Sequence, residues 1–311
     1  MGSYLVKRVL QAIGVILCIS IITFFVLNIV PGNPVRIMLG EFADEATIAR
    51  VTAEMGLDQP IIVQYFNWLK NMLMGDFGVS YFQNKPVLDI LVTSFLITAK
   101  LAGIAYLLSI VLGVVVGVVA AVNRGKWIDS FLMTLSVFGI SAPSFWIAII
   151  LQIFICLKLN LLPLSGISSV SSFILPGIAL GTRYAASVAR ITRTSMLEVL
   201  SQDYIRTAQA KGLKKWAVII KHAFRNALIP VITIAGSELG SILTGSVLIE
   251  SIFQIPGIGK MLVDSINTRD LPIVQGGVMY IAVICVIMYL VVDILYTFVD
   301  PRITLGKESE S

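Results

Sequence analysis

Long apolar runs alternate with short polar segments along almost the whole chain. Six of these runs reach the roughly 20 mostly apolar residues that a helix needs to cross a lipid bilayer. They cover residues 9–30, 98–122, 128–151, 173–191, 229–249 and 276–299. The pattern therefore predicts an all-α polytopic membrane protein with six transmembrane helices.

The first apolar run follows two basic residues, Lys7 and Arg8, as the core of a secretory signal peptide would. Its apolar part is too long for a signal peptide, and it ends in PGNP (31–34) instead of a small-residue cleavage site. We therefore expect this run to be retained as the first transmembrane helix.

A polar stretch, residues 31–97, separates the first two runs and carries seven acidic residues against four basic ones. Within it, apolar residues recur at helical spacing at Ile62, Tyr65, Phe66, Leu69, Met72 and Leu73. This spacing predicts an amphipathic helix that lies on the bilayer surface or packs on other helices. We expect residues 1–97 to form a first helix with an extracytoplasmic loop, and residues 98–311 to form a five-helix core.

Lysine and arginine are distributed unevenly between the two sides that six spans define. Fifteen fall on the side of both termini, nine of them from Arg183 to Arg225, and seven fall on the other side. Because cytoplasmic loops carry the excess of basic residues, both termini are expected in the cytoplasm. The acidic first loop is then expected outside.

The segment between the fourth and fifth runs, about residues 192–228, is long for a cytoplasmic loop. Ser201 or Asp203 is suited to cap a helix, and Ala208 and Ala210 favour one. Gly212 then predicts a turn. Beyond it, apolar residues recur at helical spacing at Trp216, Ile219, Ile220, Ala223 and Phe224. The loop is therefore predicted to be a short helix, a glycine turn and a second helix.

Composition limits the chemistry that the chain can perform. Only 13% of its residues are charged, whereas soluble domains average about a quarter. The single histidine, His222, and three dispersed cysteines predict neither a metal site nor a catalytic triad. The sequence contains no Gly-x-x-x-x-Gly-Lys-Ser/Thr phosphate-binding loop and no basic module for nucleic acid. The chain is therefore expected not to be an enzyme.

The cytoplasmic loop resembles the signature of permease subunits of bacterial ATP-binding cassette (ABC) importers. In that signature a Glu-Ala-Ala turn is followed, four residues later, by a glycine that inserts with it into the ATPase subunit. Here Arg206-Thr207-Ala208 precedes Gly212, so the spacing is kept and the glutamate is replaced. The signature's final Leu-Pro is replaced by Phe224-Arg225. Both departures are typical of the peptide, dipeptide and nickel importers.

Further segments resemble the "B" type of permease in that subgroup and extend over nearly the whole chain. They are PGNP (31–34), GLDQP (56–60), GDFG (75–78), ESIFQIPGIG (250–259), RDLP (269–272), DILY (293–296) and DPR (300–302). Each segment alone is weak evidence for the resemblance, but their shared order and their coverage of the chain are together specific to this type of permease.

The resemblance implies a type I ABC importer fold and a multi-pass subunit of the bacterial cytoplasmic membrane. Its implied partners are a second homologous permease, two ATP-binding subunits and an extracytoplasmic substrate-binding protein. ATP and Mg²⁺ are then bound by the ATPases, and this chain holds no cofactor. The residues expected to couple it to the ATPases are Tyr204, Arg206, Thr207, Ala208, Ala210, Lys211 and Gly212.

Polar residues within the predicted spans are candidates for the translocation pathway, because ionisable groups inside a membrane are costly. Glu238 lies near the middle of the fifth run, and Ser141 and Gln152 lie in or beside the third. Pro143 and Pro176 are positions where a span can kink. Three Gly-x-x-x-Gly pairs, at 113/117, 177/181 and 236/240, allow helices to approach closely.

The cargo stays open between short peptides, nickel or a metal chelate, and glutathione. Short peptides are the commonest cargo of the subgroup. Two other classes of protein compete. A secondary transporter would be expected to show internal repeats, and a membrane-embedded enzyme would need a catalytic constellation that the sequence lacks.

Overall fold

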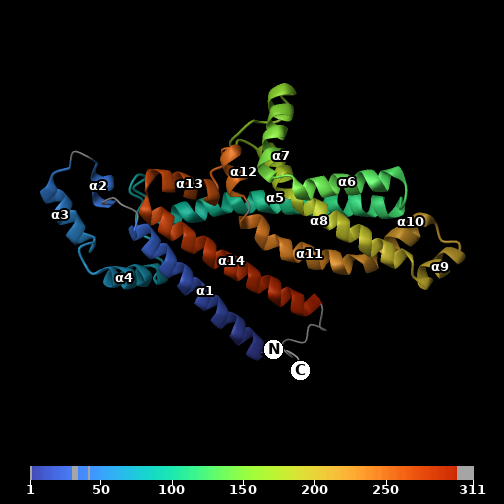
Figure 1. The fold of residues 1–311 in the computed structure, drawn as a ribbon, viewed down its shortest axis with the longest axis horizontal. Helices are drawn as coiled ribbons and strands as arrows, with labels where there is room; N and C mark the ends of the chain where they lie inside the picture. Colours follow the sequence, from blue (N-terminus) through green and yellow to red (C-terminus); the bar gives the residue numbers. More distant parts are fainter. Residues whose placement is uncertain (1, 30–33, 41–42, 245, 300–311) are drawn as a thin grey trace. The chain divides into compact units, whose positions relative to one another are not determined.

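The computed structural model describes residues 2–29, 34–40, 43–244 and 246–299. This part of the chain is helical apart from turns and one isolated antiparallel bridge between Val79 and Pro86. It divides into two compact units, one built mainly from Met1–Ile97 and Gly257–Leu290 and the other mainly from Thr98–Pro256 (Figure 1). Residues 257–290 therefore belong with the first 97 residues. Of the sequence motifs, residues 31–33 and 300–302 lie outside the described residues.

The first unit begins with α1 (Gly2–Ile29), followed by α2 (Pro34–Leu39), α3 (Glu45–Glu54) and α4 (Ile61–Leu73). The amphipathic helix predicted at 62–73 is confirmed as α4. It packs on α1 through an aromatic cluster of Phe24, Phe25, Tyr65 and Trp68. At its centre the hydroxyls of Ser20 and Tyr65 are hydrogen-bonded at 2.9 Å. Because Tyr65 is buried, its hydroxyl needs such a partner.

A buried aspartate fastens the loop after α4 to the end of α13 (Ile258–Thr268). Asp270 lies between α13 and α14 (Leu271–Val299), and its carboxylate accepts hydrogen bonds from the Ser80 hydroxyl (2.6 Å) and the Tyr81 backbone N–H (3.3 Å). Burial raises the pKa of Tyr81 to about 12, and the charge of Asp270 adds to the increase. Arg269 makes the turn in the left-handed region, with φ 59°.

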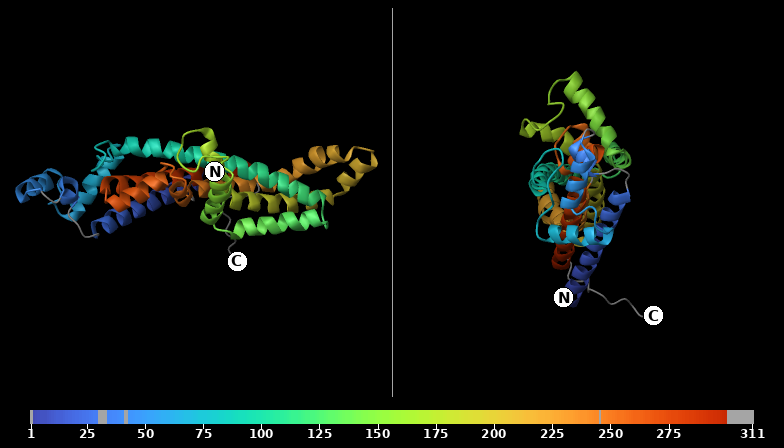
Figure 2. Two further views of the ribbon diagram at one scale, coloured as in Figure 1. Left: turned by 90° about the horizontal axis from the view of Figure 1, so that it is seen from above. Right: turned by 90° about the vertical axis from the view of Figure 1, so that its left-hand side faces the viewer.

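The second unit contains the remainder of α5 (Val87–Val122), then α6 (Trp127–Ser141), α7 (Ser144–Leu151), the π-helix η1 (Gln152–Lys158) and the 3-10 helix η2 (Val170–Phe173). Next come α8 (Ile174–Leu200), α9 (Asp203–Ala210), α10 (Lys215–Ala217), the π-helix η3 (Val218–Phe224), α11 (Arg225–Thr244) and α12 (Val247–Ile252). Figures 1 and 2 show α6 lying along α8.

Glycines bring α5 and α8 into direct contact. A Cβ on Gly113 would lie 2.7 Å from the Ala185 carbonyl, and one on Gly181 would lie 2.8 Å from the Ala105 carbonyl. The pairs at 113/117 and 177/181 therefore serve packing within this chain, where the backbones approach too closely for any side chain. A Cβ on Gly236 would meet no atom within 4 Å, so this glycine serves no such contact here.

Contacts along the second unit also fix the directions of its helices. Positions 105 and 117 of α5 meet 181 and 189 of α8, so these two helices run parallel. Asp129 of α6 meets Arg193, and Gly139 meets Ala186, so α6 runs antiparallel to α8. Since α5 and α8 run in the same direction, the chain between them must go from the end of α5 back to the side of the unit on which α5 begins.

The predicted third span, residues 128–151, is broken at the kink that Pro143 was expected to allow. The axes of residues 127–141 and 144–158 differ by 108° across Ala142 and Pro143, as the upright α7 in Figure 1 shows. Proline has no N–H for the helical ladder and its ring opposes continuation, so α6 ends before it. The fifth run is also interrupted, since α11 ends at Thr244 and α12 begins at Val247.

Among the described residues, four helices are long and apolar enough to span a membrane, or five if the bent pair counts as one span. The four are Lys7–Ile29, Val87–Val122, Lys215–Ile242 and Leu271–Val291. Helix α8 has the required length but is too polar to be among them. The count of six spans therefore stays a prediction, supported for α8 by its packing along α5.

Candidate coupling site

Helix α9 forms the predicted short helix before the glycine turn. It begins after Gln202, whose backbone is extended and whose side chain makes no capping hydrogen bond. The predicted cap at Ser201 or Asp203 is therefore wrong, and Asp203 is instead the first helical residue, where a negative charge still favours the helix dipole. Gly212, at φ +75°, turns the chain after Lys211.

One face of α9 is anchored in a buried apolar cluster, which we call the base cluster. It comprises Ala121 of α5, Met196 of α8, Ile205 and Ala208 of α9, Val218 and Ala223 of η3, and Ala227 of α11. Ile205 is fully buried, and burying a side chain of this size contributes about 1.5–3 kcal/mol. The base cluster therefore holds α9 against the ends of the longer helices.

The opposite side of α9, which we call the docking face, is exposed. It consists of Tyr204, Arg206, Thr207, Gln209, Ala210 and Lys211. The Tyr204 hydroxyl accepts a hydrogen bond of 2.9 Å from the Asn226 amide. The pair between Arg206 and Asp203 is 3.6 Å long and exposed, so it contributes little to stability. The docking face is therefore available to another subunit.

The structure brings the seven predicted coupling residues together on one helix and its turn. Five of them lie on the docking face and Gly212 makes the turn. Ala208 differs, because it is 7% exposed and belongs to the base cluster. Its small side chain lets α9 approach the helices beneath it.

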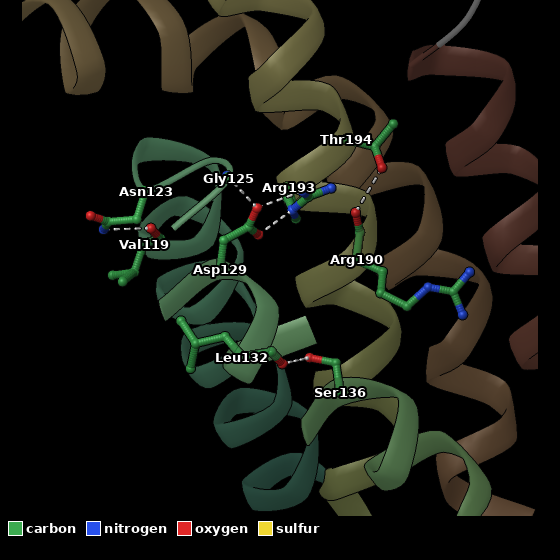
Figure 3. Close-up of polar contacts among 9 residues, drawn as sticks. All are labelled: Val119, Asn123, Gly125, Asp129, Leu132, Ser136, Arg190, Arg193 and Thr194. Atoms are coloured by element: carbon green, nitrogen blue, oxygen red, sulfur yellow. Dashed lines mark hydrogen bonds and ion pairs between the residues drawn. The ribbon is translucent and has the colours of Figure 1, made fainter. Parts of the chain in front are cut away.

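An ion pair beside this region was missed by sequence reasoning. Arg193 of α8 donates two hydrogen bonds to the carboxylate of Asp129 on α6, from Nε at 2.6 Å and from a terminal guanidinium nitrogen at 2.7 Å (Figure 3). The Gly125 backbone N–H donates a third, at 3.1 Å. Asp129 is buried, so its charge is stabilised by these three donors. The sequence signal that could have indicated this ion pair is the position of Asp129, a lone aspartate at the second residue of the apolar run 128–151.

The three predicted pathway residues have different surroundings. The Ser141 hydroxyl donates to the Val137 carbonyl in its own helix (2.9 Å). The Gln152 amide donates to the carbonyls of Leu164 (3.0 Å) and Ile252 (3.3 Å). It therefore joins η1 to the loop that follows it and to the end of α12. Glu238 of α11 is half-buried beside Ser187 and Arg183 of α8.

Metal-binding groups do not gather anywhere in the described ranges. Within residues 2–29, 34–40, 43–244 and 246–299, no three His, Cys, Asp or Glu side chains lie close enough together to hold a metal ion.

Comparison with known proteins assigns nearly the whole chain to one family of transport proteins. Residues 113–305 match the family described as binding-protein-dependent transport system inner membrane component, and residues 1–102 match its N-terminal domain. A putative peptide transport system permease protein of Brucella abortus is 40% identical, and the glutathione transport system permease protein of Salmonella typhimurium is 39% identical. Each match covers 97% of this chain and 99% of the relative.

A crystal structure of an amino acid ABC transporter with histidines shows a similar fold. The TM-score is 0.51 at 16% sequence identity, over 69% of this chain and 94% of the transporter chain.

Apolar helices long enough to span a membrane, together with the family matches, define a membrane-embedded permease subunit. The chain belongs to the binding-protein-dependent transport system inner membrane component family. It is a permease subunit of an ABC importer, and the resemblance seen in its sequence motifs is confirmed. The alternative of a secondary transporter is therefore excluded, and the family is consistent with a chain that is not an enzyme.

Proposed function

We propose that this chain forms half of a channel that imports short peptides, driven by ATPase subunits that dock on α9. The proposal of a peptide cargo rests on one observation, the name of the Brucella abortus relative, which is 40% identical over nearly the full length of both chains. Glutathione, itself a tripeptide, is a second candidate, favoured by the name of the Salmonella typhimurium relative.

The proposed machine has five parts: this chain, a second homologous permease, two ATPases and an extracytoplasmic binding protein. The ATPases hold ATP and Mg²⁺, and this chain holds no cofactor. Both termini lie in the cytoplasm, on the side of α9. The orientation is supported by Lys211 of the docking face and by the lysines that follow it, at positions 214, 215 and 221.

Reconstituted transport tests the proposed function. The complete complex in proteoliposomes is expected to accumulate labelled trialanine only when ATP and the binding protein are both present. Glutathione is assayed in parallel as the second cargo. Uptake of either peptide without ATP, or uptake of neither by a complex that hydrolyses ATP in response to its binding protein, would contradict the proposal.

Substitution of Ala210 by tryptophan tests the role of the docking face. Ala210 is exposed, so the chain is expected to fold, but the bulky side chain blocks close approach of a partner. Loss of a central interface contact typically costs about 2 kcal/mol, so transport and stimulated ATP hydrolysis are expected to fall by roughly tenfold or more. The matched control is Ala53→Trp, at an exposed alanine on α3. Equal rates for the two variants would show that α9 is not the docking element.

A further inference from the structure

Helix α8 carries a basic face along its length. Arg183, Ser187, Arg190 and Thr194 follow one another at intervals of four, three and four residues, which places them on one side of a helix. Both Arg183 and Arg190 are exposed, whereas other faces of α8 are buried against α5 and α6. Figure 3 shows Arg190 extending away from Asp129 and α6. The Arg183 and Arg190 side chains are therefore not buried by the packing of this unit, although α11 lies close to Ser187 on the same face.

The positive-inside count placed Arg183 and Arg190 on the cytoplasmic side, although both fall inside the predicted span 173–191, and the structure has both within α8. Arg183 follows the helix start by nine residues, or about 13 Å at 1.5 Å per residue. Its neighbours Gly181 and Ala185 pack on Ala105 and Gly113 of α5, in the middle of the apolar stretch of that span. If α8 enters a hydrocarbon layer about 30 Å thick at its first residues, Arg183 lies near the middle of that layer.

An arginine at this depth is strongly unfavourable against lipid tails, so such residues face a water-filled cavity or a protein partner. The side chains around Arg183 are also polar. Helix α11 packs along α8 and brings Glu238 to it. The Glu238 carboxylate lies close enough to Ser187 and Arg183 of α8 for both to interact with it electrostatically. Arg183 and Glu238 therefore bring one positive and one negative group near each other on two packed helices, and Arg190 adds a second positive group further along α8.

We infer that Arg183, Ser187 and Arg190 of α8, with Glu238 of α11, line the passage and hold zwitterionic cargo during translocation. The arginines bind a cargo carboxylate and Glu238 receives its ammonium group. This inference rests on the proposed function, since it names the chemical groups by which a short peptide is recognised.

The spacing of the charged groups suits a short peptide. Seven residues separate Arg183 from Arg190, which corresponds to about 10 Å along the helix axis. An extended tripeptide has about the same length, at roughly 3.4 Å per residue. A carboxylate leaving Arg183 therefore meets a second arginine within one cargo length on the way to the cytoplasmic end of α8.

Two other occupants of the basic face would give different results. An acidic side chain of the second permease would bury Arg183 in a subunit interface, and a lipid phosphate would bind Arg190 near the headgroups. A water-lined passage is distinguished from both because a small water-soluble reagent reaches the side chain from the aqueous phase.

Cysteine chemistry tests the passage directly. Cys18, Cys156 and Cys285 are first replaced by alanine in the complete complex, and Arg183→Cys is then introduced. The variant thiol is expected to react with water-soluble methanethiosulfonates. Trialanine uptake is expected to fall about tenfold, as for loss of a charged hydrogen bond, and to recover with the ammonium-bearing reagent but not with the sulfonate-bearing one. Arg50→Cys, at an exposed arginine on α3, is the control for reactivity, and its uptake is expected to stay unchanged.

Absence of reaction at position 183 would overturn the inference, as would equal recovery with both reagents. A second pair, Arg183→Lys and Arg183→Gln, covers the case in which the cysteine variant fails to assemble. Lysine is expected to keep most trialanine uptake and glutamine to lose it, with stimulated ATP hydrolysis retained in both. Reduced co-purification of the second permease with Arg183→Gln would instead assign Arg183 to the subunit interface. If the unaltered complex takes up no peptide, the proposed function fails, while thiol reactivity still decides whether the face is water-lined.

Discussion

Replacement of Gly117 by leucine is expected to prevent stable folding of the chain. A Cβ at this position would lie 2.5 Å from the Thr192 Cβ and 2.6 Å from the Ala189 carbonyl oxygen. Helix α8 would have to move away from α5, which would also loosen the contacts at Gly113 and Gly181. Overpacking of this kind costs about 3 kcal/mol or more. The measurement is the thermal midpoint and yield of the detergent-solubilised complex.

Gly103→Ala is the matched control on the same helix. No atom lies within 4 Å of a Cβ at Gly103, and alanine favours helix over glycine by roughly 0.5–1 kcal/mol. The control is therefore expected to be neutral or slightly stabilising. A Gly117→Leu protein with the same midpoint as the Gly103→Ala protein would show that α5 and α8 are not in close contact.

The ion pair between Asp129 and Arg193 is expected to give the second large effect. Arg193→Met removes two of the three donors to a carboxylate that is nearly inaccessible. Leaving a buried charge unpaired costs about 3–5 kcal/mol. The double variant Asp129→Leu/Arg193→Met removes both charges and is expected to be more stable than Arg193→Met alone, because apolar pairs often replace buried ion pairs without loss.

Arg50→Met is the control for this cycle, since Arg50 pairs with Glu54 on the exposed surface of α3. An exposed pair of this spacing contributes about 0.3–0.5 kcal/mol, so little change is expected. The measurement is the thermal midpoint of the unaltered protein, of Arg193→Met, of the double variant and of Arg50→Met. If the double variant is as unstable as Arg193→Met, the cost comes from lost packing around the arginine and not from the unpaired carboxylate.

Elements that are specified by neighbouring residues were predictable from the sequence. The spacing of apolar residues in 62–73 and the turn at Gly212 depend only on local chemistry, and both appear in the structure as α4 and the end of α9. The start of α9 was missed by one residue, because several polar residues in a row can each precede a helix. Pro143 predicted a break, but the 108° angle depends on the tertiary contacts of α7.

Features that join distant parts of the chain were not predictable. Asp129 and Arg193 are 64 residues apart, and nothing local in either segment indicates the pairing. Glu238 was recognised because it lies inside an apolar run. Arg183 was counted with the cytoplasmic basic residues although it lies inside the apolar run 173–191, because the sequence does not show that one helix continues from this run to Leu200.

The base cluster also determines where mutations that compensate for a damaged docking face should arise. It draws its members from α5, α8, η3 and α11 as well as α9, so the tilt of α9 depends on packing in four other elements. In a genetic selection for growth on peptide, revertants of a crippled docking face are therefore expected at positions outside α9, such as Ala121 and Met196. The pattern of suppressors would outline the cluster without any structural measurement.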